Sequence, residues 1–490
     1  MSASIRATAE QLAAVDAFEL GSDMVLEAGA GAGKTSTLKL MAAARPKLQG
    51  IYVAYNAAIA KDAKASFPAT VDCRTAHAFA NRWTVNQWGY QVLQARLKAP
   101  RVPAHKTARI LGVNDVLKLG PERMITPYQL ARIAMETAGR YCTSADTEIG
   151  HWHVPRVNGA EDKAARDALI KVVLPLARKA WADLSRATGE LRFTHDVYLK
   201  MWALTDPVLP ADYVLLDEAQ DSVPVVAKVF NQQANTQKVA VGDSCQAIYG
   251  WRGAKDAMAG MLVDHRLFLT QSFRFGPAIA DEANKWLELL SAKLRLTGTP
   301  AIASKLHPIS RPNAVLCRSN AEAVTRLMKF HEAGVPAAIV GGGNDVRWLA
   351  EAAIELQTKG RTSHPELCAF TSWGMVQDYV ENDHGGGDLA VAVKLIDTYG
   401  AEEIMAAIDR SVPESRASIV LSTAHKAKGR EWNSVQIATD FHKPSPDAQG
   451  RQVEPVPEEA MLAYVAITRA KVGLDRAGLQ WIDDYTAGRR

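Results

Sequence analysis

A glycine-rich segment near the start of the chain carries the residues with the clearest chemistry. Residues 28–35 read Ala-Gly-Ala-Gly-Ala-Gly-Lys-Thr and follow the apolar run 24–26. Alternate glycines let the backbone turn so tightly that several N–H groups point at one anion, and a following helix adds its positive end. The pattern predicts a cradle for nucleotide phosphates made of Ala28, Gly29, Ala30, Gly31, Ala32, Gly33, Lys34, Thr35 and Ser36. Its first position is alanine instead of glycine, so a flexible surface turn is the alternative.

Two residues of this cradle have side chains suited to phosphate chemistry. Lys34 would reach the β and γ phosphates, and the hydroxyl of Thr35 would ligate Mg²⁺. A second metal ligand, acting through water, is expected at the end of a neighbouring strand. Asp217 is the best candidate, because it follows the apolar run 213–216 and ligands collect at the carboxyl ends of parallel strands. An acidic residue at an exposed strand end is the alternative.

The elements that must position these residues follow an α/β pattern. Strands are expected at 24–27, 50–54, 213–216, 238–241 and 267–270, with a helix at 36–44. This strand–helix–strand order predicts a parallel sheet. A second α/β unit begins near residue 271, with strands expected at 314–317, 337–340, 418–421 and 434–438. The intervening helical, basic stretch and the mixed stretch 341–415 are then inserts in the first and second units.

Composition limits the classes of protein to which the chain can belong. The 490 residues are too many for one core, and the balance of 48% hydrophobic and 22% charged residues is typical of a soluble globular protein. No membrane span or secretory signal is recognisable, so we expect a cytoplasmic protein, nucleoid-associated in a bacterium or phage and nuclear in a eukaryote. The five cysteines form no CxxC pair, and His151 and His153 near Cys142 make a weak metal motif.

The net charge of +4 is slight, so a nucleic-acid surface must come from local clusters of basic residues. Seven Lys or Arg residues lie between Arg96 and Arg123 against two acids. Five lie between Ser291 and Arg318 against none. For each cluster, phosphate binding and a solvated helix face are equal alternatives.

Taken together and in order, several segments resemble the motifs of the UvrD/Rep group of superfamily 1 DNA helicases. They are Thr8–Gln11, Ala28–Thr35, Val53–Asn56, Thr75–His77, Leu216–Asp221, Gly242–Ala254, Gln271–Arg274, Ser422–Trp432 and Tyr464–Lys471. The spelling at 52–64, 269–276 and 423–429 is most similar to the helicase core of the F-box DNA helicases. No F-box is expected before the glycine-rich segment.

The resemblance implies an α/β fold with two RecA-like P-loop domains, each with a parallel sheet and an inserted, mainly helical subdomain. We expect residues 1–90 and 196–270 to form the first domain, called 1A, around the insert 91–195, called 1B. Residues 271–343 and 416–490 would form the second domain, 2A, around the small insert 344–415, called 2B. The short second insert puts regulation by its rotation in doubt.

At the nucleotide, the resemblance implies that Gln11 reads adenine, Phe273 packs on it and Glu431 touches the ribose. Glu218 would be the base that aligns the attacking water, and Gln246 would sense the γ phosphate. Two arginine fingers lie outside the first domain, so ATP is expected in a cleft between the domains. The implied catalytic residues are Lys34, Glu218, Gln246, Arg274 and Arg469, with ATP and Mg²⁺ as cofactors.

The resemblance also implies a track for single-stranded DNA, with aromatic platforms for the bases and polar groups for the phosphates. Its residues would be Tyr55, Asn56, His77, Tyr249, Trp251, Arg252, Arg318, Thr423 and His425; packing in a core is the alternative for the two aromatics at 249 and 251. The chain departs from its relatives at Ala76, where phenylalanine is usual, and at Arg430 and Trp432, which replace the commoner Leu and Phe. None of these departures removes a catalytic group.

The resulting hypothesis is a monomeric, ATP-dependent 3′–5′ DNA helicase of replication, recombination or repair. Its partners would be single-stranded DNA and junctions with duplex, with recombinase filaments or replication proteins as further candidates, and no membrane. The first alternative is a translocase that strips proteins from DNA without processive unwinding. A P-loop kinase or a catalytically silent DNA-binding scaffold fits the complete motif set less well.

Overall fold

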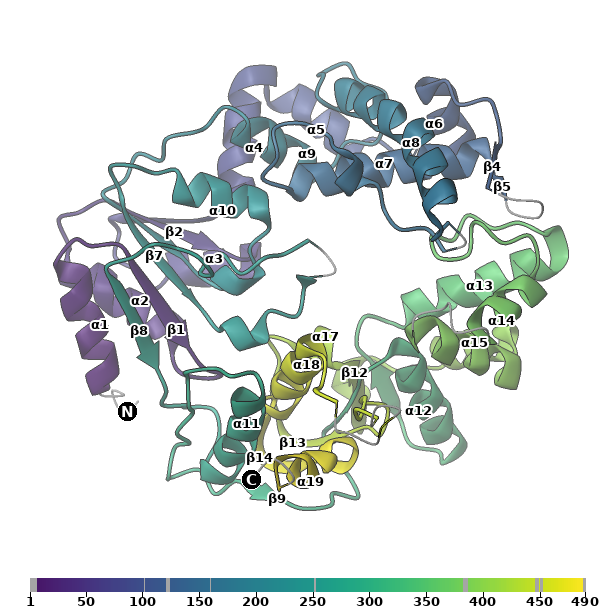
Figure 1. The fold of residues 1–490 in the computed structure, drawn as a ribbon. Helices are drawn as coiled ribbons and strands as arrows, with labels where there is room; N and C mark the ends of the chain where they lie inside the picture. Colours follow the sequence, from purple (N-terminus) through teal and green to yellow (C-terminus); the bar gives the residue numbers. More distant parts are fainter. Residues whose placement is uncertain are drawn as a thin grey trace.

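A computed structural model describes residues 7–100, 102–119, 124–158, 160–250, 253–381, 387–445, 449 and 453–487. Around the molecule, the first sheet is followed by one helical region, a second helical region and then the second sheet, so the two helical regions are neighbours (Figure 1). The first sheet lies beside the helical region that joins its third and fourth strands in the sequence, and the second sheet lies beside the smaller helical region.

The first sheet has six parallel strands in the order β3-β2-β6-β7-β1-β8. The strands are β1 (Met24–Ala28), β2 (Gly50–Ala54), β3 (Val71–Thr75), β6 (Tyr213–Leu216), β7 (Gln237–Gly242) and β8 (His265–Leu269), with helices α1 (Ala9–Glu19), α2 (Lys34–Ala44), α3 (Ala57–Lys64) and α10 (Pro224–Asn231) around them. The five strands predicted from apolar runs are confirmed. The sequence analysis missed β3, because this edge strand alternates buried and more exposed residues and so has no apolar run.

Residues 76–203 form the helical region of the first half. Its helices are α4 (Ala76–Trp88), α5 (Tyr90–Lys98), α6 (Ala104–Leu111), α7 (Pro127–Thr143), α8 (Lys163–Leu184) and α9 (His195–Ala203), with the short antiparallel pair β4 (Leu117–Lys118) and β5 (Met124–Ile125). Helices α4 and α9 already pack on the first sheet, so one continuous apolar core joins the sheet to the helices.

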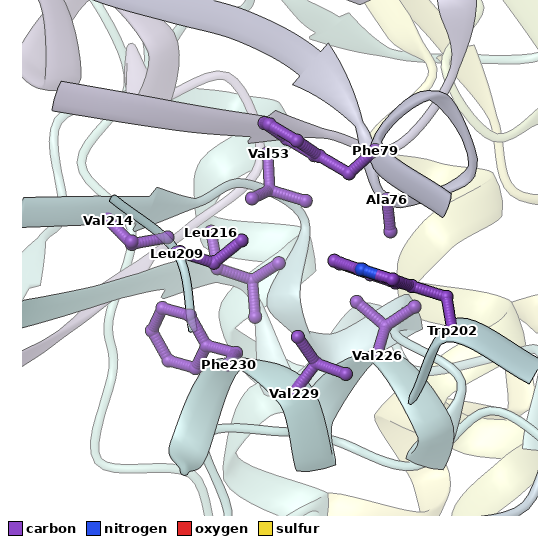
Figure 2. Close-up of a pocket in the computed structure, with 10 residues that line it drawn as sticks. All are labelled: Val53, Ala76, Phe79, Trp202, Leu209, Val214, Leu216, Val226, Val229 and Phe230. Atoms are coloured by element: carbon purple, nitrogen blue, oxygen red, sulfur yellow. The ribbon is translucent and has the colours of Figure 1, made fainter. Parts of the chain in front are cut away.

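A small apolar cavity of about 20 Å³ marks the junction between the first sheet and these helices. Figure 2 shows Phe79 from α4 and Trp202 from α9 on either side of it, and Ala76 directed at the same space. The rings of Phe79 and Trp202 stack with centroids 6.4 Å apart. Apolar side chains line the cavity, and the small side chain of Ala76 leaves part of this space unfilled.

The second sheet also has six parallel strands, in the order β11-β12-β10-β13-β14-β9. They are β9 (Lys305–Leu306), β10 (Ala314–Cys317), β11 (Ala337–Ile339), β12 (Ile419–Thr423), β13 (Trp432–Ile437) and β14 (Ala470–Asp475), covered by α11 (Pro277–Leu289), α12 (Asn320–Glu332), α17 (Ala424–Ala427), α18 (Pro457–Ile467) and α19 (Trp481–Ala487). The four predicted strands are confirmed. The insert is helical, with α13 (Asn344–Lys359), α14 (Trp373–Glu381), α15 (Gly387–Tyr399) and α16 (Ala401–Asp409).

The two helical regions touch each other (Figure 1). The side-chain amide of Gln129, at the start of α7, donates hydrogen bonds to the carbonyl oxygens of Thr362, 2.9 Å away, and Cys368, 2.5 Å away. Asn158 likewise donates to the carbonyl oxygen of Glu366 at 3.1 Å. The inserts therefore join the two halves of the chain at a second place, away from the sheets.

Several sequence interpretations are decided by this fold. Arg96, counted in the first basic cluster, is 8% exposed and donates to the carbonyl oxygens of Gly189 and Leu191, so its charge holds a loop and is not part of a phosphate surface. In the part of the chain that is described, no helix has the length and apolarity needed to cross a bilayer. No group of three or more metal-binding side chains occurs among the same residues.

Candidate active site

The glycine-rich segment joins β1 to α2 at the carboxyl edge of the first sheet. Gly31 and Gly33 have φ angles of 76° and 77°, in the left-handed region that favours glycine, and Gly33 forms the N-cap of α2. The first amides of a helix have no partner within it, so those of α2 remain available to an anion. This geometry fits the phosphate cradle expected from the sequence.

The residues predicted to hold the base meet on one side of this cradle. A Cβ atom at Gly33 would come within 3.2 Å of the Gln11 amide nitrogen and 3.3 Å of the Phe273 ring. Gln11 is 4% exposed, and its side chain donates to Thr37 and accepts from the amide of Thr8. Gln11 and Phe273 therefore lie together beside the cradle, although they belong to different halves of the chain.

Lys34 projects from the first turn of α2 toward the ends of β6 and β7. Its ammonium nitrogen lies 3.2 Å from a carboxylate oxygen of Glu218, and the Thr35 hydroxyl lies 3.4 Å from Asp217. Tyr52 donates a hydrogen bond of 2.5 Å to the same Asp217 oxygen. Glu218 itself has a φ of 52°, a backbone conformation that a non-glycine residue adopts only when its surroundings impose it.

The charges of this cluster are strongly coupled. Burial opposes ionisation of Glu218, but the Lys34 ammonium and the Gln220 amide outweigh it and lower the pKa of Glu218 to about 2. Burial, followed by the neighbouring Glu218, raises the pKa of Asp217, and burial raises that of Asp243. The pocket thus holds one lysine among three carboxylates, of which Glu218 keeps its charge most firmly.

These side chains fit a hydrated magnesium ion bound with phosphates. The hydroxyl of Thr35 and the carboxylate of Asp217 are oxygen ligands of the kind that Mg²⁺ prefers, and they lie next to each other beside the cradle. Asp217 is 4% exposed, and its buried carboxylate would gain from a second cation. Two protein ligands are enough, because Mg²⁺ keeps water and phosphate oxygens in its remaining positions.

The second half of the chain supplies two arginines to the same pocket. Arg469 follows α18, is 2% exposed and donates to Gln246 Oε1 at 3.2 Å. Its other hydrogen bonds go to the carbonyl oxygen of Val465 and the hydroxyl of Thr468, and among the described residues no carboxylate pairs with it. Burial and the nearby charge of Arg274 lower the pKa of Arg469, so this cation is held where an added anion would stabilise it.

Arg274 lies against the cradle itself. A Cβ atom at Gly31 would come within 2.7 Å of the Arg274 Cβ, and the amide of Phe273 donates to the Gly31 carbonyl oxygen at 2.9 Å. The guanidinium of Arg274 pairs with Glu431 at 2.8 Å and donates to the Thr468 carbonyl oxygen at 3.1 Å. Both residues predicted to be arginine fingers therefore lie next to the predicted nucleotide pocket, Arg274 against the cradle and Arg469 against Gln246.

Gln246 connects the pocket to further residues of both halves. Its amide nitrogen donates to Asp243 at 2.6 Å, and the hydroxyl of Tyr464 donates to the same Asp243 carboxylate at 3.0 Å. The Tyr464 hydroxyl also accepts a hydrogen bond from the amide of Ala30 in the cradle. Asp243 and Tyr464 lie within the quoted motifs, but no role for either could be predicted from the sequence alone.

Lys428 is a third residue for which no role was predicted from the sequence. Its ammonium nitrogen lies 2.5 Å from the Asp221 carboxylate, bonds the carbonyl oxygen of Gln246 and lies over the Tyr249 ring, 5.2 Å from the centroid. Burial raises the pKa of Asp221 to about 6 against the opposing effect of Lys428. This lysine from the second half therefore links the acidic end of β6 to the residues predicted to contact DNA.

The predicted DNA track is only partly open in the structure. Tyr55 is 46% exposed, and the side chain of Asn56 caps α3 by accepting from the amide of Ile59. His77 lies 3.0 Å from Asp196, on the side where α4 meets α9. Tyr249 is half-buried and donates to the carbonyl oxygen of His425 at 3.1 Å, which joins the two halves of the predicted track. Trp251 and Arg252 lie outside the described residues.

Three residues are engaged differently from the sequence expectation. Thr423 is 4% exposed, and its hydroxyl caps α17 by accepting from the amide of Lys426. Arg318 pairs with Glu459 at 2.7 Å and with Asp388, so its charge is already neutralised. Glu431 pairs with Arg274 and Lys471 instead of facing an open pocket. Their predicted contacts with DNA or ribose stay predictions; in the structure these groups have the partners just described.

Family models match the two halves of this pocket. Residues 198–260 match the model described as UvrD/REP helicase N-terminal domain, and residues 346–475 match the UvrD-like helicase C-terminal domain. The chain carries both UvrD-like helicase domains. The first match contains Asp217, Glu218 and Gln246, and the second contains Arg469, so each domain contributes to the pocket.

Curated relatives extend the similarity over most of the chain. It is 29% identical to F-box DNA helicase protein 1 of Schizosaccharomyces pombe, covering 92% of this chain and 55% of the relative. It is 26% identical to F-box DNA helicase 1 of Gallus gallus, covering 93% and 47%, and 28% identical to DNA helicase IV of Escherichia coli over 26% and 20%. The chain spans about half the length of the F-box relatives. The UvrD-like helicase resemblance and the α/β fold expected from the sequence are confirmed.

Proposed function

We propose that the chain is an ATP-driven motor that moves 3′ to 5′ along single-stranded DNA and separates the duplex ahead of it. The observation that carries this proposal is the pocket built from both halves, with Lys34 and Glu218 on one side and Arg274 and Arg469 on the other. A substrate bound across two domains changes their relative position when it binds and when it is split. The direction of movement rests on the family resemblance.

The Lys34–Glu218 ion pair would keep Glu218 inactive as a base until ATP is bound. While the ammonium holds Glu218, a pKa of about 2 makes this carboxylate a weak base. The γ phosphate of ATP competes for Lys34, and a Glu218 released from the lysine then regains basicity and can align the attacking water. Bound Mg²⁺ would neutralise charge on the phosphate oxygens, with Thr35 and Asp217 holding it.

Arg469 and Arg274 complete the pocket when the domains close. Charge spreads over the equatorial phosphate oxygens in the transition state, and a buried guanidinium stabilises it strongly because little water competes. Through the hydrogen bond from Arg469 to Gln246, cleavage of the γ phosphate would then change the position of Gln246 in the first domain. Lys428 and Tyr249 carry the change onward, because they touch Gln246 and His425 respectively.

The substrates of the motor would be single-stranded DNA and its junctions with duplex, with a single copy of the chain at work. Roles in replication, recombination or repair, and recombinase filaments as partners, remain parts of this proposal. The F-box DNA helicases that match the chain are about twice its length, so partners bound by their remaining parts are not transferred to it.

Duplexes of identical sequence with either a 3′ or a 5′ single-stranded tail test the proposal. We expect ATP-dependent unwinding from the 3′ tail and little from the 5′ tail, measured as release of a labelled strand. A chain that unwinds neither substrate but clears a recombinase filament from single-stranded DNA would be the protein-stripping translocase. Absence of any DNA-stimulated ATP turnover would overturn both.

A further inference from the structure

An exposed tryptophan in the helical region has no part in the motor described above. Trp152 lies in the short 3-10 turn η1 (His151–His153) between α7 and α8 and is 61% exposed. Single apolar residues on a surface are common and need no explanation. The geometry around Trp152, however, is that of a side chain held in one position.

The indole ring is fixed at its edge and covered on one face. Its N–H donates a hydrogen bond of 2.8 Å to Asp146, which also lies 3.0 Å from His153 Nε2. A Cβ atom at Gly150 would come within 2.4 Å of the ring, so the glycine backbone lies directly against it. Since 61% of the residue remains exposed, the ring presents a rigid apolar surface to the outside.

The position of this turn connects it to the predicted DNA track. A Cβ atom at Gly253 would lie 3.7 Å from the Thr143 hydroxyl, so Gly253 lies against the last residue of α7, next to Ala254, whose amide donates to the carbonyl oxygen of Tyr249. His153 Nε2 lies 3.1 Å from the hydroxyl of Ser144, the next residue. The segment that carries Trp152 therefore begins beside the turn that contains Tyr249.

The same segment ends at the second insert. Asn158 donates to the carbonyl oxygen of Glu366, while Gln129 at the other end of α7 bonds Thr362 and Cys368. The stretch from Ser144 to Asn158 thus runs alongside α7 between the track and the second insert. A strand of DNA leaving Tyr249 along the helical region would follow it.

Basic side chains lie on the segment that follows the tryptophan and on α7 and α8 beside it. Arg156 is exposed, and Arg140 on α7 has a half-exposed side chain that pairs with Glu136 at 3.0 Å. Arg166 is close to both, and it bonds the carbonyl oxygens of Val154 and Pro155. Of the acids near the turn, Glu136 and Asp146 are engaged in the contacts already described, whereas Glu148 is exposed. An aromatic face with cationic neighbours is the combination that binds single-stranded DNA without reading its sequence.

We infer that Trp152 is a stacking platform for a base of single-stranded DNA and extends the track from Tyr249 onto the helical region. Arg156 and Arg140 lie where they can contact the neighbouring phosphates. The inference rests on the proposed function, because it requires that Tyr249 contacts DNA. It predicts that the chain binds a longer stretch of single-stranded DNA than the nine track residues assigned from the family motifs could contact by themselves.

The test is equilibrium binding of fluorescein-labelled oligo(dT) of increasing length to the full chain, followed by anisotropy. We expect Trp152→Ala to weaken binding about tenfold or more for oligonucleotides long enough to reach the turn, while the shortest ones bind as tightly as before. Trp152→Phe keeps an aromatic face and should retain most of the affinity. Tyr90→Ala is the matched control, because Tyr90 on α5 is 64% exposed in the same helical region.

The outcomes separate the inference from the proposed function. Equal affinity of wild type and Trp152→Ala at every length overturns the stacking platform and leaves the motor intact, as does an equal loss in Tyr90→Ala. A wild-type chain that binds no oligo(dT) and shows no DNA-stimulated ATP turnover overturns the motor and, with it, the platform. Thermal unfolding of each variant verifies that the fold is retained.

Discussion

The two sheets share one architecture, but they differ where a central strand enters its helix. After β1, five residues with two left-handed glycines form a cradle and lead into α2. After β10, the chain enters α12 directly through Arg318 and Ser319. The amides of these two residues donate to Asp440 at 3.0 and 2.9 Å, so a carboxylate of the protein occupies the anion position at this helix.

This difference indicates how one fold serves two roles. In the first domain, the N-terminus of α2 and Lys34 lie at the cradle that we propose holds a substrate anion, whereas in the second domain Asp440 accepts from the amides just before α12. The second domain is then free to contribute arginines from a different place, the corner between α18 and β14 that holds Arg469. Only the first domain should bind nucleotide alone, and only both together should split it.

Replacing the buried arginine tests this division most severely. Arg469→Met should lower DNA-stimulated ATP turnover about 10³-fold or more, because an arginine finger contributes that much to phosphoryl transfer. The thermal midpoint should stay the same or rise, since the substitution removes a buried cation that has no carboxylate partner among the described residues. Steady-state turnover and calorimetry measure the two effects; turnover within tenfold of wild type would return Arg469 to a structural role.

Glu218→Gln examines the chemistry of the first domain. Turnover should fall about 10²–10⁴-fold, because the amide cannot accept a proton from the attacking water. Nucleotide binding should persist, since Lys34 and the cradle are intact and the lysine loses its competing carboxylate. Titration with a fluorescent ATP analogue follows binding, and Lys305→Ala, at an exposed lysine of β9, is the control that should alter neither quantity.

The acid dependence of stability should reveal the same carboxylate. The pKa of Glu218 in the folded chain is about 2, below the ordinary 4.5, because Lys34 outweighs the effect of burial. The folded state therefore binds fewer protons there, and the stabilisation is complete above pH 4.5 and lost as the pH falls toward 2. Thermal midpoints of wild type and Glu218→Gln should converge over this range; a constant difference would contradict the ion pair.

Asp440→Ala should convert the second helix into an open anion site. Removing the carboxylate leaves the amides of Arg318 and Ser319 without their acceptor, at a cost of about 1–3 kcal/mol. The midpoint of thermal unfolding should fall by several degrees. Inorganic phosphate should restore part of the loss in this variant and leave wild type unchanged; equal responses would argue against the comparison drawn between the two helices.

Arg318→Met should have the smallest effect and distinguishes a structural arginine from a DNA contact. The substitution breaks the pair with Glu459, whose side chain is 20% exposed, so we expect a loss of about 1 kcal/mol. Affinity for single-stranded DNA and its dependence on salt should not change. A clearly shallower salt dependence would restore Arg318 to the track.

Much of the first sheet could be predicted because β1, β2, β6 and β7 are almost wholly buried and therefore appear as apolar runs. The edge strand β3 could not, since only part of it is buried. Among site residues, Lys34, Thr35 and Asp217 followed from local pattern, whereas Gln246, Arg274 and Arg469 depended on the order of motifs along the chain. The contacts of Lys428 and Tyr464 could not be predicted, because the partner of each residue lies about two hundred positions away in the sequence.

The sequence by itself determined the glycine cradle, the acidic strand end and the alternation of α and β elements, because these depend on neighbouring residues and on burial periodicity. Only the tertiary structure decided that the polar groups of Arg318, Thr423 and Glu431 have partners within the protein. It also decided that Arg469 lies buried without a carboxylate partner among the described residues. The physical reason is that a charged or polar side chain acts according to what it faces across the fold. That pairing is set by packing between distant segments and is not encoded in the type of residue alone.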